Sequence, residues 1–309
     1  MKTQKNSTFG ETAPSRPAAS LGKFQAVRLQ RDGRQLPRKF GWGWGCALFF
    51  ALPLLVILAY LFAPLRSNIL ILGVDGGLGR GDLGRTDTII LATVSPLQPQ
   101  VGMLSIPRDL WVTQPDGSEN RINTAFFFAE AENPGSGARA TGRVVYQNFG
   151  VPVHHTVVLR MDGVVGIVDA LGGVEISLDR AQAGYAAGVH RLDGAQALAF
   201  SRNRSDGDDF GRMAQGQILL RGVMRELLKP SAWDNLPAFF AAAQDAADMD
   251  IPVWQWPRLG LAFLRAGPGG IESRVIDRAM VTPFTTSGGA QVLRPNWDAI
   301  KPVLEEMFR

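Results

Sequence analysis

Two aspartates on either side of a glycine-rich segment are the first residues whose type and spacing suggest chemistry. Asp75 follows the apolar run 68–74, Asp87 lies at the start of the β-branched run 86–94, and glycine occupies five of positions 76–85. A dinucleotide-binding loop would require a helix after the glycines, whereas a strand follows here. Two carboxylates at a hairpin mouth suit a hard divalent cation that also meets phosphate oxygens. Because Asp and Gly are ordinary turn residues, a turn without a metal is the alternative.

A set of arginines is the second candidate. Arg108 follows the end of a predicted strand, and Arg212 lies at the start of a long helical pattern. Arg202 and Arg204 are two positions apart, so in an extended stretch both would point to one side. A guanidinium binds phosphate through two parallel hydrogen bonds and stays charged when partly dry, so such a cluster could hold a diphosphate. The alternative is a solvated surface on which the arginines pair with Asp206, Asp208 and Asp209.

The elements that must position these side chains follow from periodicity. Short apolar or β-branched runs predict strands at 68–74, 86–94, 100–106, 155–160, 174–178 and 273–277. Helical patterns cover 123–131, 138–149, 162–171, 193–200, 210–228, 235–247, 256–265 and 297–308, with Asp193 as an N-cap. Continuous apolarity indicates strands that are covered on both faces. We therefore predict an α/β fold, a single mixed-sheet αβα domain with helices on both faces of the sheet.

Charge and hydropathy separate at the amino terminus. Residues 1–45 carry nine basic and two acidic side chains, a net charge of +7, which leaves about −3 for the rest of a chain whose total is +4. We expect 1–45 to be a basic, disordered cytoplasmic tail. Segment 46–65 is nearly all apolar and long enough to span a bilayer, with Trp42 and Trp44 at the position of an interfacial aromatic belt. We predict an uncleaved single-pass transmembrane helix at 46–65 and an extracytoplasmic domain at 67–309. A cleaved signal peptide and a buried core helix are the alternatives.

The composition excludes several classes of protein. With 46% hydrophobic and 19% charged residues among 309, the chain is not a disordered protein, and its 35 glycines show no collagen-like period. One cysteine excludes an intramolecular disulfide framework, and three histidines leave little for a histidine-built metal centre. The pI of about 9.5 reflects the basic tail rather than a basic domain, so we expect no nucleic-acid partner.

Six short motifs occur in order along residues 68–228. They are NILILGVD with GRTDT, VGMLSIPRDLWV, RINTAF, VDALGGVEI, LDGAQALAFSRNR and DDFGR. Together they resemble the LytR-CpsA-Psr family, and SIPRD with DALGGV is a fairly specific combination. The resemblance implies a cytoplasmic tail, one membrane helix and an extracytoplasmic α/β catalytic domain. It also implies a phosphotransferase that moves a glycopolymer from an undecaprenyl-diphosphate carrier to a peptidoglycan hydroxyl at the bacterial cell membrane.

The resemblance assigns roles residue by residue. The metal-binding carboxylates of the family fall on Asp75 and Asp87, which implies Mg²⁺ or Mn²⁺ as the cofactor. The diphosphate-binding arginines fall on Arg85, Arg108, Arg202, Arg204 and Arg212. We take Asp75, Asp87 and Arg108 as the catalytic residues. One departure occurs in Gln215-Gly216-Gln217, where the phosphate-contacting glutamine of the family aligns with Gly216, so that its contact is lost or supplied by Gln215 or Gln217.

The implied reaction is attack by a sugar hydroxyl on the glycan-proximal phosphorus, with undecaprenyl phosphate as the leaving group. Charge that develops on the phosphoryl oxygens would be neutralised by the cation and the arginines. The prenyl chain would need an apolar tunnel, which we expect between sheet and helices. Two other hypotheses are a non-catalytic, membrane-anchored envelope regulator or binder, and a hydrolase of the same lipid diphosphate.

Overall fold

The computed structural model describes residues 42–63, 65–75, 84–96, 100–203 and 209–308, with side chains described from Phe49 onward. Three predicted features lie outside these residues: nearly all of the basic tail, most of the glycine-rich segment, and Arg204 with Asp206 and Asp208. The chain divides after Ala51, and everything described below except the start of helix α1 (Trp42–Leu61) belongs to the part from Leu52 to Arg309.

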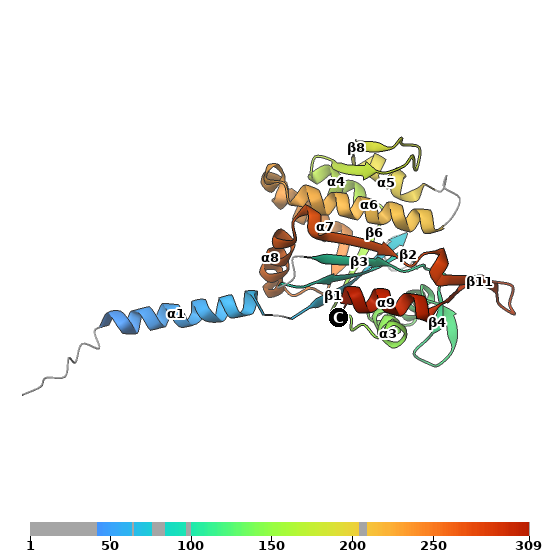
Figure 1. Ribbon diagram of the computed structural model, residues 1–309, viewed down its shortest axis with the longest axis horizontal. Helices are drawn as coiled ribbons and strands as arrows, with labels where there is room; N and C mark the ends of the chain where they lie inside the picture. Colours follow the sequence, from blue (N-terminus) through green and yellow to red (C-terminus); the bar gives the residue numbers. More distant parts are fainter. Residues whose placement is uncertain (1–41, 64, 76–83, 97–99, 204–208, 309) are drawn as a thin grey trace, which may run out of the picture. The chain divides into compact units, whose positions relative to one another are not determined.

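A mixed sheet forms the centre of the domain (Figure 1). Within the described residues it has six strands in the spatial order β10-β3-β2-β1-β6-β9. The strands are β1 (Ser67–Asp75), β2 (Arg85–Val94), β3 (Val101–Ser105), β6 (His155–Arg160), β9 (Ala247–Met249) and β10 (Ile271–Val275). The pairs β1–β6 and β3–β10 are parallel, and the remaining neighbours are antiparallel. The predicted mixed sheet is confirmed, with β9 as a short edge strand that the sequence did not predict.

Side chains of the central strands alternate between two cores, as a strand period of two requires. Leu70, Leu72 and Val74 of β1 pack in one cluster with buried side chains of the helices α3 (Gly137–Phe149) and α9 (Trp297–Phe308). Ile69 and Ile71 of β1 pack in another cluster on the opposite face, with side chains of the helices α6 (Asp209–Leu227) and α8 (Trp256–Ala266). All of β3 is buried. The prediction of strands covered on both faces is therefore confirmed.

The helices lie where the periodicity predicts them. They are α2 (Thr124–Glu132), α3 (Gly137–Phe149), α4 (Val164–Ala170), α5 (Gly194–Arg202), α6 (Asp209–Leu227), α7 (Leu236–Ala246), α8 (Trp256–Ala266) and α9 (Trp297–Phe308). In Figure 1, α3 and α9 lie on one side of the sheet, and α6 lies on the other with α4 and α5 beyond it. Asp193 caps α5 as predicted, since its side chain accepts from Gln196 N while the Gln196 side chain accepts from Asp193 N.

Among the described residues, three two-stranded hairpins lie outside the main sheet. They pair β4 (Trp111–Thr113) with β5 (Glu119–Arg121), β7 (Val174–Leu178) with β8 (Gly188–Leu192), and β11 (Val281–Thr285) with β12 (Gln291–Pro295). Only β7 was predicted, and it belongs to a hairpin rather than to the main sheet. The buried face of β7–β8 packs with α4, α5 and Leu219 of α6 in a separate core, so that α6 is enclosed between this core and the sheet.

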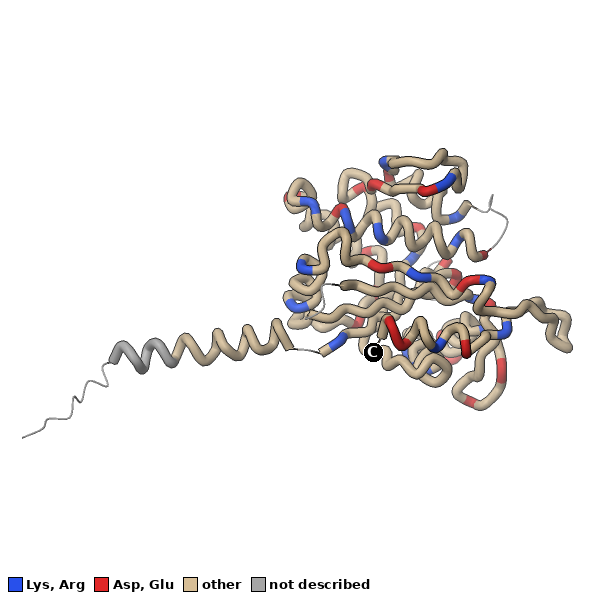
Figure 2. The backbone as a smooth tube through the Cα atoms, in the orientation of Figure 1, with Lys and Arg blue, Asp and Glu red and all other residues tan. Residues whose placement is uncertain are grey.

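Helix α1 (Trp42–Leu61) covers most of the predicted membrane anchor and contains Pro53. Its described part carries no charged residue in Figure 2, whereas charges of both signs are spread over the sheet domain. Large apolar side chains from Phe49 to Leu65 are exposed, including Phe49 at 72% and Leu52 at 66%. In the described part of the chain, no helix combines the length and apolarity needed to cross a membrane. The anchor at 46–65 remains a prediction.

Candidate active site

The first carboxylate of the site is placed by the end of β1. Asp75 is the last residue of this strand and pairs with Arg85 at the start of β2. Because Val74 faces the α3 side, the neighbouring Asp75 faces the α6 side. Its side chain is 55% exposed and accepts a hydrogen bond of 2.7 Å from the Nη2 of Arg202.

A β-bulge places the second carboxylate. Gly73 pairs with Thr88 and Val74 pairs with Thr86, which leaves Asp87 as an extra residue in β2. In a regular strand, Asp87 would share the α3 face with Ile89 and Leu91. With the bulge, Asp87 and Thr88 line the same cavity although they are adjacent in sequence. A bulge commonly re-aims a side chain in this way beside an active site.

The cavity on the α6 side of the sheet, which we call the Asp75 cavity, has a volume of about 270 Å³. Its described lining comes from the ends of β1 and β2, the residue after β6, the end of α5 and the start of α6. These residues are Asp75, Asp87, Thr88, Met161, Ser201, Arg202, Arg212, Met213 and Gly216. The structure thus brings four of the predicted site residues to one cavity: both aspartates, Arg202 and Arg212.

Arginines and carboxylates alternate around this cavity. Arg108 donates from Nη1 to Asp87 Oδ1 at 2.6 Å and from Nε to Asp209 Oδ2 at 3.0 Å. Arg212 donates to the other oxygen of Asp209 at 2.5 Å. Hydrogen bonds therefore link Asp87 to Arg108, Arg108 to Asp209, and Asp209 to Arg212. The Asp75–Arg202 pair is a separate ion pair that lines the same cavity. Since Arg108 and Arg212 are only 23% and 14% exposed at their side chains, this network is not a solvated surface.

Burial and charge act in opposite directions on Arg108. Burial lowers its pKa, but the hydrogen bond and charge of Asp87, together with Asp209 and Asp109, raise the pKa above its ordinary value overall. Burial raises the pKa of the neighbouring Asp109 despite the opposing charges of Arg108 and Arg121. Arg108 therefore stays charged at any physiological pH.

Two predicted arginines differ from expectation. Arg202 is the last residue of α5 rather than part of an extended stretch, and the prediction that Arg202 and Arg204 point to one side is not tested, because Arg204 lies outside the described residues. The capped α5 continues to Arg202, and the chain becomes extended only at Asn203. Arg85 is exposed and lies over the ring of Phe127, with its Cζ atom 5.5 Å from the centroid, and is not among the described cavity-lining residues.

The segment Gln215–Gln217 corrects another expectation. Oriented to satisfy its amide, Gln215 donates to the carbonyls of Asn203 and Phe200 at 3.0 and 3.2 Å and is fully buried. Gln217 is held on the other side of α6 by the carbonyl of Arg274. Only Gly216 lines the cavity, and a Cβ built there meets no atom within 4 Å. Neither glutamine can therefore supply the phosphate contact, because both are committed to holding α6 in place.

The donor set fits a hard divalent cation. Asp75 and Asp87 are carboxylates that line one cavity, and Mg²⁺ is commonly held by one or two carboxylates together with waters and substrate phosphates. Among the described residues, no cluster of three or more His, Cys, Asp or Glu side chains is arranged to hold a metal. Such a cation would displace or share the oxygens that Arg108 and Arg202 now bind.

Two features of the site were missed from the sequence. Asp209 was treated only as a possible surface partner, although it links Arg108 to Arg212. Its position three residues before Arg212 at the start of a helix was an available signal. The bulge at Asp87 had no comparable signal, because register depends on the partner strand.

Comparison with known proteins agrees with this architecture. The model of the LytR_cpsA_psr family matches residues 65–308. The chain is 31% identical over 229 residues to the polyisoprenyl-teichoic acid–peptidoglycan teichoic acid transferase TagU of Enterococcus faecalis, covering 72% of each protein. It is 36% identical over 167 residues to the TagU of Oceanobacillus iheyensis, covering 52% of this chain and 51% of that protein.

Solved structures show the same fold. Protein gbs0355 of Streptococcus agalactiae superposes with a TM-score of 0.66 at 20% identity, covering 81% of this chain and 90% of that one. TagV of B. subtilis superposes with a TM-score of 0.64 at 21% identity, covering 79% and 98%. The resemblance noted in the sequence motifs is thus confirmed over nearly the whole domain, and the chain belongs to the LytR_cpsA_psr family.

Proposed function

We propose that this chain is a phosphotransferase that moves an anionic or capsular glycopolymer from an undecaprenyl-diphosphate carrier to a hydroxyl of peptidoglycan. The observation that carries the proposal is the Asp75 cavity, where two carboxylates and two arginines converge at the ends of neighbouring strands. The names of the TagU relatives, which describe transfer from a polyisoprenyl carrier to peptidoglycan, support the same reaction.

The arginine network suits a diphosphate because each guanidinium already binds an oxygen anion. A diphosphate that enters the cavity would offer Arg202 and Arg212 phosphoryl oxygens in place of carboxylate oxygens, with the same charge-assisted geometry. Arg108 is not among the described lining residues, but its hydrogen bond to Asp87 holds that carboxylate in position. Preorganised donors of this kind stabilise charge as it develops in the transition state.

In the proposed reaction, the acceptor hydroxyl oxygen forms a bond to the glycan-proximal phosphorus, and the bond from that phosphorus to the bridging oxygen breaks. The hydroxyl proton is released, and undecaprenyl phosphate leaves with the electron pair of the broken bond. A Mg²⁺ or Mn²⁺ ion held by Asp75 and Asp87 would supply positive charge against the diphosphate oxygens. Arg202 and Arg212 orient the diphosphate, while Met161 and Met213 give the cavity an adaptable apolar wall for the start of the prenyl chain.

The proposed membrane location rests on the amino-terminal part of the chain. The large apolar side chains from Phe49 to Leu58 are exposed, as expected of a segment that lipid covers. A net charge of +7 before this segment, against Arg66 directly after it, supports a cytoplasmic amino terminus and an extracytoplasmic domain. An alkaline phosphatase fused after Arg309 should be active in cells, and a cytoplasmic reporter at the same position should be inactive; the reverse pattern would overturn the orientation.

The decisive experiment measures products with and without acceptor. Purified full-length protein in detergent is given a lipid-diphosphate-linked glycan and Mg²⁺, with or without peptidoglycan fragments. A transferase joins glycan phosphate to the acceptor and releases undecaprenyl phosphate only when acceptor is present. Release of free glycan phosphate at the same rate without acceptor would replace the transferase with a hydrolase, and binding without either product would indicate a non-catalytic binder. Asp234→Asn, at an exposed residue of the 3₁₀ helix η1 (Pro230–Asn235), serves as the matched control.

A further inference from the structure

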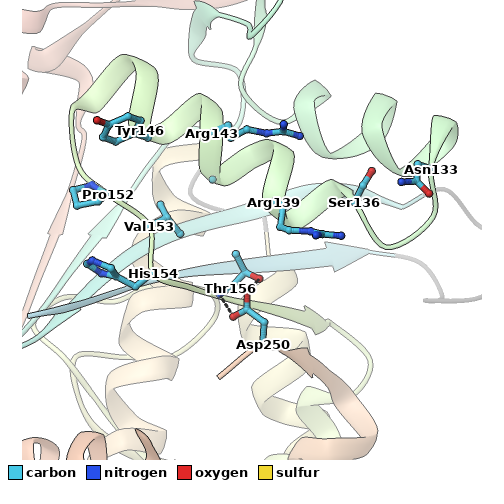
Figure 3. Close-up of a pocket in the computed structure, with 11 residues that line it drawn as sticks. Asn133, Ser136, Arg139, Arg143, Tyr146, Pro152, Val153, His154, Thr156 and Asp250 are labelled. Atoms are coloured by element: carbon cyan, nitrogen blue, oxygen red, sulfur yellow. Dashed lines mark hydrogen bonds between the residues drawn. The ribbon is translucent and has the colours of Figure 1, made fainter. Parts of the chain in front are cut away.

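A second and larger concavity lies on the other side of the sheet (Figure 3). It has a volume of about 750 Å³ and lies between α3 and the chain segment that leads into β6. We call it the α3 groove. Thr156 pairs with Leu70, whose side chain faces the α3 side, so the floor of the groove is on the face opposite the Asp75 cavity. A ligand in the groove would leave that cavity open.

One wall of the groove is a stripe along α3. Arg139, Arg143 and Tyr146 recur at helical spacing, so they share one face of the helix. The buried face of α3 is formed by other residues, including Val144, Val145 and Phe149. Tyr146 is 60% exposed. The stripe therefore lies at the edge of the helix, where packing against the sheet does not require it.

The two arginines of the stripe, Arg139 and Arg143, differ from those of the Asp75 cavity in what surrounds them. Among the described residues, neither Arg139 nor Arg143 has a carboxylate or carbonyl partner, although both are exposed and one turn apart. The carboxylate among the described lining residues of the groove is that of Asp250, and it already accepts from the backbone and hydroxyl of Thr156 at 2.6 and 3.0 Å. The guanidinium donors are thus available to a ligand.

The opposite wall offers a neutral donor. His154 Nδ1 accepts a hydrogen bond of 2.9 Å from the backbone N–H of Asn68, which leaves the proton of a neutral ring on Nε2. Burial, followed by the charge of His155, lowers the pKa of His154, so the ring is neutral at pH 7. Pro152 and Val153 complete this wall with apolar surface.

We infer that the α3 groove binds a phosphate-bearing glycan chain, with Arg139 and Arg143 on its phosphates and Tyr146 against a sugar face. Exposed guanidinium groups attract phosphate by their charge and donate charge-assisted hydrogen bonds to it, and an exposed aromatic ring with a polar tip suits a partly apolar, hydroxyl-rich ligand. The open shape favours a chain that passes through the groove over a small molecule enclosed in it. Under the proposed function, such a chain is the donor glycopolymer, held at a distance from its reacting end.

The test is calorimetric binding of purified, glucosylated poly(glycerol phosphate), which carries both phosphates and sugars, to the full-length protein in detergent. The double variant Arg139→Gln/Arg143→Gln should bind about tenfold more weakly than wild type, because two charge-assisted contacts are lost. The control, Arg180→Gln/Lys301→Gln, removes the same charge at two exposed positions outside the groove and should bind within about twofold of wild type.

Several outcomes would overturn the inference. Equal binding by wild type and the groove variant would show that the arginines are only a solvated helix face. Equal binding of neutral dextran of the same length would remove the role of phosphate. Binding of purified peptidoglycan strands in place of the phosphate polymer would assign the groove to the acceptor, and binding only of anionic lipid vesicles would assign it to the membrane. Because binding does not require turnover, failure of the proposed reaction would leave this test intact.

Discussion

The Asp75 cavity and the α3 groove are each lined by two arginines, but the partners of these arginines differ. In the cavity, Arg202 and Arg212 are matched to carboxylates at 2.7 and 2.5 Å. In the groove, Arg139 and Arg143 have no such partner among the described residues. Paired charges hold their geometry before any ligand arrives, which suits chemistry, whereas unpaired surface charges attract a polyanion with little preference for its orientation. This contrast predicts that transfer in the cavity depends on the exact geometry of the arginines, whereas polymer binding in the groove depends only on their charge.

The largest expected effect comes from removing both cavity carboxylates. Asp75→Asn with Asp87→Asn should lower transfer by at least about a hundredfold, because the charge that would hold the cation is gone. Donor binding should be retained or become tighter, since Arg202 and Arg108 lose their competing carboxylates. Chelation of wild-type protein should reproduce the loss of turnover. Normal transfer by a double variant with wild-type thermal melting would refute the metal-assisted mechanism.

Arginine-to-lysine exchange compares the two regions directly. Arg108→Lys should reduce transfer by about thirtyfold although charge is retained, because lysine cannot reach Asp87 and Asp209 at once in the present geometry. Arg143→Lys should change binding of poly(glycerol phosphate) by less than about twofold, since a point charge suffices there. Equal sensitivity of the two positions would remove the distinction between a geometric site and an electrostatic one.

Asp209 tests whether the network positions the arginines. Asp209→Asn should lower kcat/KM by about tenfold through a higher donor KM, because Arg108 and Arg212 lose the charge that holds them together. Asp209→Glu should restore part of the loss. If thermal stability falls while KM is unchanged, Asp209 is a structural residue of α6 and has no role in donor binding.

A change in salt concentration should affect binding in the groove more than binding in the cavity, but this difference should be smaller than those produced by the substitutions above. Between 0.1 M and 1 M NaCl the Debye length falls from about 10 Å to about 3 Å, so exposed charges are screened more than partly buried ones. Polymer binding in the groove should weaken by about fivefold, and the donor KM in the cavity should change by less than about twofold for a donor with one sugar unit. Parallel titrations on one protein preparation measure both quantities. A steeper salt dependence in the cavity would contradict the assignment.

The smallest effect is expected at Gly216. Gly216→Gln should be accommodated without a clash, because a Cβ there meets open space, and should stabilise α6 by about 0.5 kcal/mol through helix propensity. Its amide would lie in the cavity and should lower the donor KM by about twofold. Gly216→Ala provides the control for helix propensity alone and should leave KM unchanged. A loss of activity in both variants would mean that substrate occupies the space beside Gly216.

The sequence predicted the individual helices and long strands of this fold better than it predicted how the strands pair. Long periodic segments such as α3 and α6, and buried strands such as β1 and β2, lie within a few residues of their predicted bounds, because periodicity reports burial directly. The hairpins β4–β5 and β11–β12 were missed, since strands of three to five residues with mixed burial leave almost no periodic pattern.

The candidate site shows the same division. The sequence motifs identified Asp75, Asp87, Arg202 and Arg212, which the structure gathers at one cavity. They did not identify which of Gln215, Gly216 and Gln217 faces it, because a helix directs three consecutive residues to three sides and the partner of each decides its role. The sequence therefore predicted which residue types form the site, but the direction of each side chain depended on tertiary packing.

The extra residue in β2 has a consequence for how relatives of this chain should be aligned. Between Asp87 and the hairpin tip, every residue of β2 is out of phase with the rest of the strand, so Thr86 is fully buried where an unbroken ladder would turn it to the other face. A substitution at position 87 removes one ligand. A one-residue deletion there would remove the same ligand together with the bulge, and it would leave Thr86 paired with Val74 and Arg85 paired with Asp75 in an unbroken ladder. In an alignment of this hairpin, a gap at residue 87 therefore indicates the loss of one carboxylate with the register of β1 and β2 kept, so the residues on both sides of the gap remain comparable.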